Sequence, residues 1–365
     1  MVLQEIISCL EKIAPPKFQE GYDNCGLITG NSKMQITGVL IALDCIESIV
    51  DEAIENKCNL IVAHHPIVFS GLKKINGKNY VERVIIKAIK NDIAIFAIHT
   101  NLDNVSNGVN ARICEILGLK NCKILSPKKD LLRKFVTYCP AESAEKVRQA
   151  LWKAGAGEIG NYNEVSFNLS GTGTFRGNEN SNPVVGDKGI LNREPEERIE
   201  IIYSVHQESE ILKALRASHP YEEIAYELIP IENAWQNVGS GMIGELEKSM
   251  PIMEFLIQLK TSMNTDVIRY TPIEGKVVSK VAVCGGSGSF LLKDAISAEA
   301  DVFVSGDFKY HQFFDTEGKI VVADIGHFES EQFTIDLLYD ILKQKFPTFA
   351  IRKTGINTNP ITYLT

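Results

Sequence analysis

The chain has 365 residues, of which 44% are hydrophobic and 23% charged, a balance that excludes a disordered chain and a length that predicts two or three domains. Its 38 lysines and arginines against 46 aspartates and glutamates give a formal net charge of −8. Proteins that grip phosphate backbones usually carry the opposite sign, so we expect no general nucleic-acid binding, although a local pocket for one phosphorylated small molecule stays open.

The N-terminal segment predicts a helix rather than a targeting signal. Apolar residues recur at helical spacing from Leu3 to Ile13, and Pro15 and Pro16 end the pattern. No apolar run approaches the ~20 residues of a membrane span, so we expect no membrane association. The eight cysteines form no C-x-x-C pair, which disfavours a cysteine zinc site and is typical of reduced thiols in a cytoplasmic protein.

Two similar series of apolar strands occupy the outer parts of the chain. The first has strands at 39–43, 60–63 and 93–98, with helices at 48–55 and 81–90 between them; the second has strands at 281–284, 302–304 and 320–323. Alternating strands and helices predict a parallel or mixed sheet that is covered on both faces. We expect two related α/β halves, although any α/β protein can yield two such series.

The segment between the two series follows a different order. It predicts, in turn, a strand, a helix, two strands, a helix and a strand, at 133–139, 141–153, 162–169, 198–205, 208–217 and 223–230. This β-α-β-β-α-β order is the ferredoxin-like arrangement, and the Gly-, Asn- and Pro-rich stretch 171–195 predicts a long mobile connection. We therefore expect residues 126–234 to be an inserted ferredoxin-like α+β domain, and residues 1–125 and 235–365 to form one discontinuous α/β domain.

Four of the seven histidines come directly after an apolar strand. They are His64, His65, His99 and His327. Functional sites of open α/β sheets form beyond the carboxyl ends of the strands, so these histidines mark a candidate site. His64 and His65 can converge only where the strand ends, because neighbouring strand side chains face opposite ways, and the following proline forces such a turn. The alternative is a pair of ordinary turn histidines.

Carboxylates accompany these histidines. Asp103 lies four residues after His99 and can offer oxygen to a divalent ion, while His99 itself can be a ligand, a donor to a ligand or a core residue. His327 and Glu331 are four residues apart, on one face of a helical turn, and Glu331 can bridge two ions through its two oxygens. The alternative for Glu331 is an ordinary acid in a first helical turn.

Together, His64, His65, Asp103, His327 and Glu331 make a nitrogen and oxygen ligand set. Such a set suits Zn, Fe, Mn, Co or Ni. Five side chains are too few to close two coordination shells, so water or substrate must complete them. An open shell is what a hydrolytic site needs, because the metal lowers the pKa of bound water and polarises the bond that is attacked.

A glycine-rich stretch follows the first strand of the second series. Gly285, Gly286, Ser287 and Gly288 stand between a predicted strand and a predicted helix, where backbone N–H groups can meet an anion. We predict a phosphate loop here, with a tight turn as the alternative. The stretch lacks the Gly-Lys-Ser/Thr of a P-loop and fits no strict dinucleotide fingerprint.

The ordered motifs of the outer segments resemble the Nif-three-like family, also known as GTP cyclohydrolase I type 2 homologues. They are YDNCGL at 22–27, AHHP at 63–66, HTNLD at 99–103, VCGGSGSF at 283–290, GDFKYHQ at 306–312, DIGHFESE at 324–331 and INTNP at 356–360. Two positions depart from the family pattern: Asp307 stands where glutamate is common, and Phe328 where tyrosine is common. SHPYEEIAYEL at 218–228 is similar to the PII/CutA-like module of the longer members.

The resemblance implies a dinuclear metal site with the same five ligands, two divalent ions per chain, and a homohexameric ring. It also implies GTP cyclohydrolase I chemistry, in which water adds at C8 of guanine, the imidazole ring opens and formate leaves. We therefore expect a metal-dependent hydrolase of a nucleotide or related phosphorylated small molecule. In it, His99 or His311 would move protons, and the glycine loop and Lys309 would receive phosphates. The alternatives are a non-enzymatic metal-handling or regulatory protein and a partner-binding scaffold.

Overall fold

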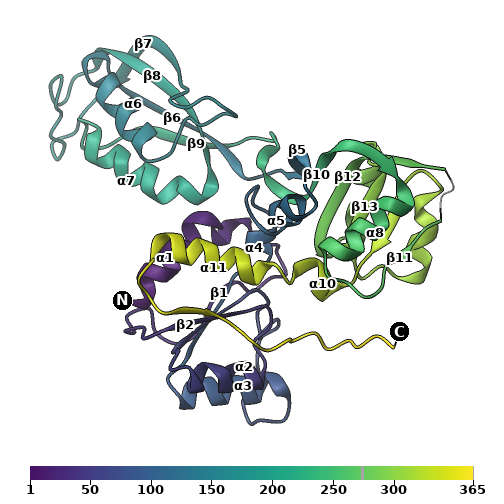
Figure 1. Cartoon of the computed structure of the whole chain (residues 1–365). Coiled ribbons are helices and arrows are strands. Elements are labelled where there is room, and N and C mark those ends of the chain that lie inside the picture. Colours follow the sequence, from purple (N-terminus) through teal and green to yellow (C-terminus); the bar gives the residue numbers. More distant parts are fainter. Residues whose placement is uncertain (273–274, 365) are drawn as a thin grey trace. The chain divides into compact units, whose positions relative to one another are not determined.

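The computed structural model describes residues 1–272 and 275–364, and these form two compact units (Figure 1). Unit 1 comprises Met1–Pro127 and Asn237–Thr365, and unit 2 comprises Lys128–Gln236. Residues 273, 274 and 365, which belong to the predicted outer segment 235–365, lie outside the described residues. No helix in the described part of the chain is long and apolar enough to cross a membrane.

The first sheet of unit 1 has the strand order β1-β4-β3-β2-β15. The strands are β1 (Gly26–Thr29), β2 (Val39–Ala42), β3 (Leu60–Ala63), β4 (Ala94–Ala97) and β15 (Ile351–Lys353). All are parallel except β1, which pairs antiparallel with β4. The three central strands are completely buried, which is why their sequences are continuous apolar runs and do not alternate.

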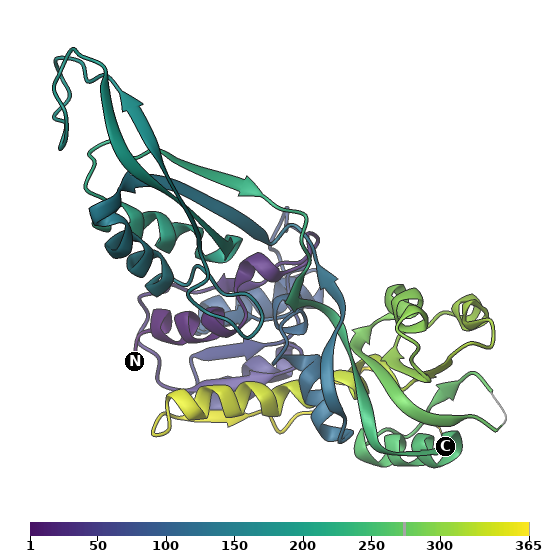
Figure 2. The ribbon, with the colours of Figure 1, turned by 90° about the horizontal axis from the view of Figure 1, so that it is seen from above.

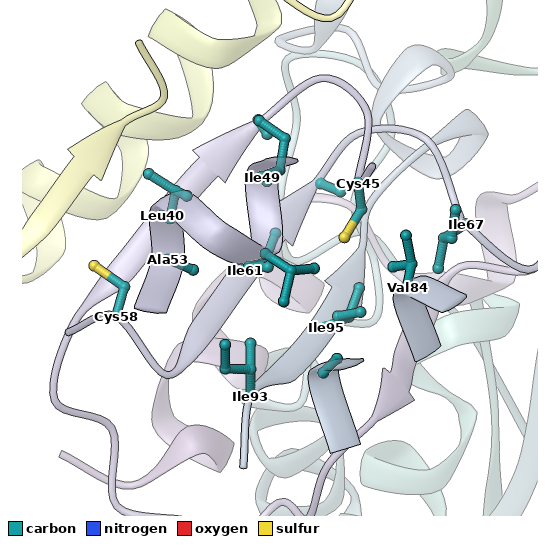
Figure 3. Packing of buried hydrophobic residues seen from close by; sticks show 14 of the residues in the cluster. Leu40, Cys45, Ile49, Ala53, Cys58, Ile61, Ile67, Val84, Ile93 and Ile95 are labelled. Atoms are coloured by element: carbon teal, nitrogen blue, oxygen red, sulfur yellow. The ribbon is translucent and has the colours of Figure 1, made fainter. Parts of the chain in front are cut away.

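Helices cover both faces of this sheet (Figure 1). On one face lie α2 (Glu47–Glu55) and α3 (Tyr80–Lys90), and on the other lie α1 (Leu3–Ile13) and α11 (Thr334–Lys345). Figure 3 shows how α2 and α3 pack on the strands through Leu40, Ile49, Ile61, Val84 and Ile95. This core fixes the strand ends, and with them the side chains that follow.

The second sheet of unit 1 has the strand order β11-β14-β13-β12-β10-β5. The strands are β5 (Lys120–Lys128), β10 (Trp235–Pro251), β11 (Arg269–Tyr270), β12 (Val277–Ser287), β13 (Val302–Gly306) and β14 (Val321–Asp324). The strands β12, β13 and β14 are parallel, and β11 and β10 flank them antiparallel. The order β11-β14-β13-β12 repeats the order β1-β4-β3-β2 of the first sheet, strand for strand.

Short helices carry the chain away from both sheets. The helices α4 (Thr100–Asp103) and α5 (Val109–Ile116) follow β4, and α10 (His327–Glu331) follows β14. The second sheet packs with α8 (Ile252–Ser262) and with α9 (Leu292–Ser297), and the core that α9 shares with the sheet includes Phe303 and Phe308. The short helices matter most, because α4 and α10 hold candidate site residues.

Unit 2 has the element order β6-α6-β7-β8-α7-β9, the β-α-β-β-α-β order of the ferredoxin-like arrangement. The elements are β6 (Leu132–Pro140), α6 (Ala144–Lys153), β7 (Phe167–Phe175), β8 (Asn192–Ser204), α7 (Glu208–Ser218) and β9 (Tyr226–Pro230). The strands form an antiparallel sheet in the order β7-β8-β6-β9, and both helices lie on one face of it (Figure 2). Phe135, Leu151 and Ile199 belong to its core.

The long β7–β8 hairpin corrects one sequence-based expectation. The predicted strand 162–169 begins only at Phe167, and it continues to Phe175. The predicted connection 171–195 therefore has strands at both of its ends, which pair from Phe167 opposite Glu200 to Phe175 opposite Asn192. The glycines Gly171 and Gly173 lie inside β7 and tolerate this pairing, although glycine is disfavoured in strands.

Candidate metal centre

Two histidines follow β3 at the carboxyl end of the first sheet. His64 is completely buried, and its Nδ1 donates to the carbonyl oxygen of Ile98 at 2.9 Å. The Nδ1 of His65 lies 2.8 Å from Oδ1 of Asp44, the second residue after β2. A ring whose Nδ1–H is held by an oxygen presents the lone pair of Nε2, which is the usual arrangement of a metal-binding histidine.

Two further histidines are held in the same way. The Nδ1 of His99 lies 2.9 Å from Oδ1 of Asp23, and the Nδ1 of His327 lies 2.6 Å from Oδ2 of Asp307. Asp23 is also fixed by the backbone N–H of Thr100, at 3.0 Å. Each of the four histidines thus has an oxygen partner on Nδ1, and its Nε2 is left for the site.

Three of the four free ring nitrogens converge on Glu331, and that of His99 is not among them. Its Oε2 lies 2.9 Å from Nε2 of His65 and 3.2 Å from Nε2 of His327, while its Oε1 lies 3.8 Å from Nε2 of His64. His64 Nε2 is also 3.6 Å from Oδ1 of Asp103. The structure therefore brings all five predicted ligand residues together, with the two oxygens of Glu331 facing two different groups.

These groups have the composition of metal sites. Ligand atoms of His65, His327 and Glu331 lie within 4.8 Å of one another, and so do those of His64, Asp103 and Glu331. His64 and His65 also form such a group with His99. Imidazole and carboxylate donors suit the divalent ions from Mn to Zn, so the residues present fit such an ion.

Two atoms of the cluster are buried without a hydrogen-bond partner. They are Nε2 of His64 and Oδ1 of Asp103. The great majority of buried polar atoms in proteins are satisfied, because an unpaired one costs about 1–3 kcal/mol. Two such atoms that lie only 3.6 Å apart are what a cation between them would explain.

The electrostatics of the cluster favour cation binding. Burial lowers the pKa of His64 to about 4, so this ring is neutral and able to bind a metal. Burial and the neighbouring Glu331 raise the pKa of Asp103 well above its usual range. Burial opposes the ionisation of Glu331, but the hydrogen bonds from His327 and His65 and the nearness of His64 outweigh it and hold its pKa well below the usual value.

The protonated state of the other two histidines compensates this negative charge. Burial disfavours their charge, but hydrogen bonds to Asp44 and Glu331 raise the pKa of His65 to about 10. Hydrogen bonds to Asp307 and Glu331 likewise raise the pKa of His327 to about 11. A divalent ion would replace these protons as the partner of the carboxylates.

The glycine stretch at the end of β12 makes room for Glu331. A Cβ on Gly286, whose φ is +62°, would lie 2.4 Å from Oε1 of Glu331. The N–H groups of Gly285 and Gly286 already donate to Asn110 Oδ1 and Ser330 Oγ, each at 2.9 Å. Ser287 lines the cavity described below, whereas a Cβ on Gly288 would clash with Ser305. Two of the four predicted loop donors are therefore already used within the protein.

A cavity of about 670 Å³ adjoins the cluster. His65, His99, Asp103, His327 and Glu331 are among its lining residues. His311 is not: it is exposed in the 3-10 helix Tyr310–Thr316, with its ring against Tyr310 and Phe314. Of the two histidines proposed to move protons, the structure brings only His99 to the cavity.

The aspartates that hold the histidine rings were missed as site residues. Asp44 and Asp307 come just after the strands β2 and β13. A search for carboxylates beyond the carboxyl ends of the strands, and not only for histidines, finds both. Asp307 is also one of the two departures from the family pattern. Asp23 precedes the edge strand β1, and its distance from His99 along the chain does not indicate that the two side chains meet.

Comparison with known proteins identifies relatives along the whole chain. The family model Duf34/NIF3 (NGG1p interacting factor 3) matches residues 1–360. A Halalkalibacterium halodurans protein named GTP cyclohydrolase 1 type 2 homolog is 38% identical over 367 residues, which cover 99% of this chain and 98% of that protein. A Bacillus subtilis protein of the same name is 35% identical over 371 residues, with the same coverage.

Solved structures agree with this match. A Bacillus cereus protein described as related to NIF3 superposes with a TM-score of 0.85 at 37% sequence identity, covering 100% of this chain and 99% of the other. The Staphylococcus aureus protein SA1388 superposes with a TM-score of 0.78 at 29% identity and the same coverage. The fold described above is therefore that of proteins related to NIF3.

Proposed function

The chain belongs to the Duf34/NIF3 family, and we propose that it is a hydrolase that depends on two divalent metal ions. The observation that carries this proposal is the buried, unpaired pair His64 Nε2 and Asp103 Oδ1 beside Oε1 of Glu331. One ion would be held by His64, Asp103 and Glu331, and the other by His65, His327 and Glu331. Zn, Fe, Mn, Co and Ni all suit these ligands.

The chemistry of the centre follows from its open shells. Bound divalent ions lower the pKa of water and polarise the bond under attack. The side chains around them have separate tasks. Asp44 and Asp307 hold His65 and His327 in the ligating orientation, and Asp23 holds His99 with its Nε2 free. His99 lines the cavity and is the residue that we assign to accept a proton there.

The substrate that we propose is a nucleotide, with GTP as the candidate. The names of the relatives, GTP cyclohydrolase 1 type 2 homolog, support this choice, and the cavity is large enough for a small-molecule ligand. In this reaction one water adds at C8 of guanine and the imidazole ring opens to a formamide, and a second water hydrolyses the formamide and releases formate. A homohexamer, a cytoplasmic location, and a PII/CutA-like inserted domain at 126–234 between the outer segments 1–125 and 235–365 belong to the same proposal.

Formate release from GTP tests the proposal. Protein reconstituted separately with Zn, Mn, Fe and Co is compared with Glu331→Gln and with the control Glu329→Gln. Glu329 is a buried carboxylate of the same helix α10, but it accepts from Asn359 and is outside the histidine cluster. We expect turnover in the wild type and the control and none in Glu331→Gln. Two bound ions without turnover of any nucleotide would favour a metal-handling role instead.

A further inference from the structure

Aromatic side chains surround the cavity beside the metal centre. Tyr22, Phe69, Tyr80, Phe290 and Phe328 line it, and all except Phe328 are exposed. They come from separate segments of unit 1, so their gathering around one cavity is not a consequence of local sequence. Exposed aromatic residues scattered singly need no explanation, but a group of them at one concave site indicates a ligand.

This aromatic wall reaches the cluster itself. The ring of Phe69 meets the ring of His99 edge to face, with 5.6 Å between their centroids. A planar ligand that lies against Phe69 therefore also lies beside His99. Stacking on aromatic faces tolerates many heterocycles, because every one of them has a π face.

The charges of the cavity are wrong for a polyphosphate. Four carboxyl groups line it, those of Glu20, Asp44, Asp103 and Glu331, and among the described lining residues there is no lysine or arginine. Two divalent ions would at most balance these four groups and leave no surplus positive charge. Phosphates are usually held by Arg, Lys or free backbone N–H groups. Lys309 does not line the cavity, and the N–H groups of Gly285 and Gly286 are already used.

Hydrogen-bonding side chains other than those of the cluster also line the cavity. Asn104 donates from Nδ2 to Oε1 of Glu20 at 2.9 Å, and its Oδ1 accepts from Ser240 at 3.1 Å. All three residues line the cavity. Amide, hydroxyl and carboxylate groups without a cation are suited to the N–H and C=O edge of a heterocycle.

We infer that this cavity recognises its substrate through a planar nitrogen heterocycle, and that phosphate groups contribute little to binding. The inference rests on the proposed function, because it names the part of the substrate that the proposed metal centre acts on. It places the heterocycle of the substrate against the aromatic side chains that line the cavity, and it leaves any phosphates outside the lining. The substrate class is then the base or nucleoside, with a nucleotide accepted only through its base.

Calorimetric titration of the metal-loaded full chain tests this inference. The probes are guanosine, GTP and ribose 5-phosphate. We expect guanosine and GTP to bind with dissociation constants within about threefold of each other. Contacts between the phosphates and positively charged groups would make GTP bind more tightly than guanosine, and each such contact would increase the ratio of the two constants. Ribose 5-phosphate is expected not to bind. GTP bound more than about tenfold tighter than guanosine, guanosine not bound, or ribose 5-phosphate bound would each overturn the inference.

A matched pair of variants tests the aromatic wall directly. Phe290 lines the cavity and is 64% exposed, whereas Phe314 lies outside it and is 65% exposed, so neither substitution removes a core residue. Phe290→Ala should weaken guanosine binding by about 5- to 160-fold, the usual range for one stacking side chain. Phe314→Ala should leave it unchanged. Equal guanosine affinity in both variants would contradict the inference.

The binding measurement separates this inference from the proposed reaction. Guanosine bound through Phe290, without formate release from GTP, would refute the cyclohydrolase reaction and leave the substrate class standing. Formate release from GTP together with phosphate-dependent binding would refute the inferred substrate class and leave the cyclohydrolase reaction standing.

Discussion

Nε2 of His64 and Oδ1 of Asp103 lie 3.6 Å apart, both buried and both without a hydrogen-bond partner. His64 cannot donate from Nε2 in its neutral form, because its Nδ1 carries the hydrogen that bonds to the carbonyl of Ile98. The two atoms are therefore two acceptors facing each other. A cation resolves this arrangement.

Replacing Asp103 by asparagine should affect the metal-free and the metal-loaded protein in opposite directions. Burial and Glu331 raise the pKa of Asp103, so its ionised form destabilises the fold without a metal. We expect Asp103→Asn to raise the free energy of unfolding of chelator-treated protein by about 1 kcal/mol. The stabilisation gained on adding metal should shrink. Thermal unfolding with and without chelator measures both, and a lower stability of the chelator-treated variant would contradict the account.

The aspartates that hold the histidine rings should tune metal affinity without changing the number of ions. Asp44→Asn and Asp307→Asn weaken the partners of His65 and His327, and we expect metal affinity to fall by about 10–100-fold in each. Competition with a chelating dye measures this. The exposed Asp315→Asn is the control. Affinities equal to that of the control would show that the aspartates do not orient the ligands.

Unit 2 should lose stability in mild acid through His219. Its Nε2 donates to the carbonyl oxygen of Tyr138, and its Nδ1 accepts from the N–H of Tyr221 at 3.1 Å, so a second proton would break the latter bond. Burial lowers the pKa of His219, and the neutral ring is the form that the fold favours. Its contribution is therefore complete above the unfolded value of about 6.5 and is lost as the pH falls below it.

The variant His219→Asn tests this pH dependence. Its amide oxygen can still accept from Tyr221, but it does not titrate. We expect the melting temperature to fall less between pH 7.5 and pH 5.5 in the variant than in the wild type. An equal fall in both proteins would assign the acid sensitivity to other groups.

Core substitutions should separate the two units. Phe135 is completely buried in unit 2, and Ile61 is completely buried in β3, three residues before His64. Phe135→Ala should destabilise unit 2 by about 3–5 kcal/mol and leave metal content unchanged. Ile61→Ala should cost about 2–5 kcal/mol and lower metal affinity as well. Unfolding followed by circular dichroism and metal analysis of the folded fraction measure both, and a loss of metal in Phe135→Ala would contradict this division.

The central strands and most helices could be predicted because their signals are local. The run LIVA at 60–63 is β3 itself, and the helix expected over residues 3–13 is α1. The edge strands could not be predicted, because partly buried strands such as β1 and the short β15 lack a continuous apolar run. The length of β7 is set by its pairing with β8, whereas the glycines of β7 predicted a loop between two strands.

The meeting of the five proposed ligand residues could be predicted because each follows a strand end or shares a helical turn, and both rules are local. The roles of the glycines could not. A Gly-rich turn has the same sequence whether it holds an anion or makes room for a side chain, and the approach of Glu331 to Gly286 is a long-range contact that the local sequence does not indicate. His311 shows the limit of residue type alone, since nothing in its sequence context separates an exposed histidine from a catalytic one.

The number of metal ions bound per chain tests the central claim most directly. Wild type, Glu331→Gln and Glu329→Gln are loaded with manganese or zinc, freed of excess metal, and analysed by inductively coupled plasma mass spectrometry. The account predicts about two ions per chain in the wild type and in Glu329→Gln, and at most one in Glu331→Gln, because the two oxygens of Glu331 face both groups. Equal metal content in all three proteins, or no bound metal in the wild type, would contradict it.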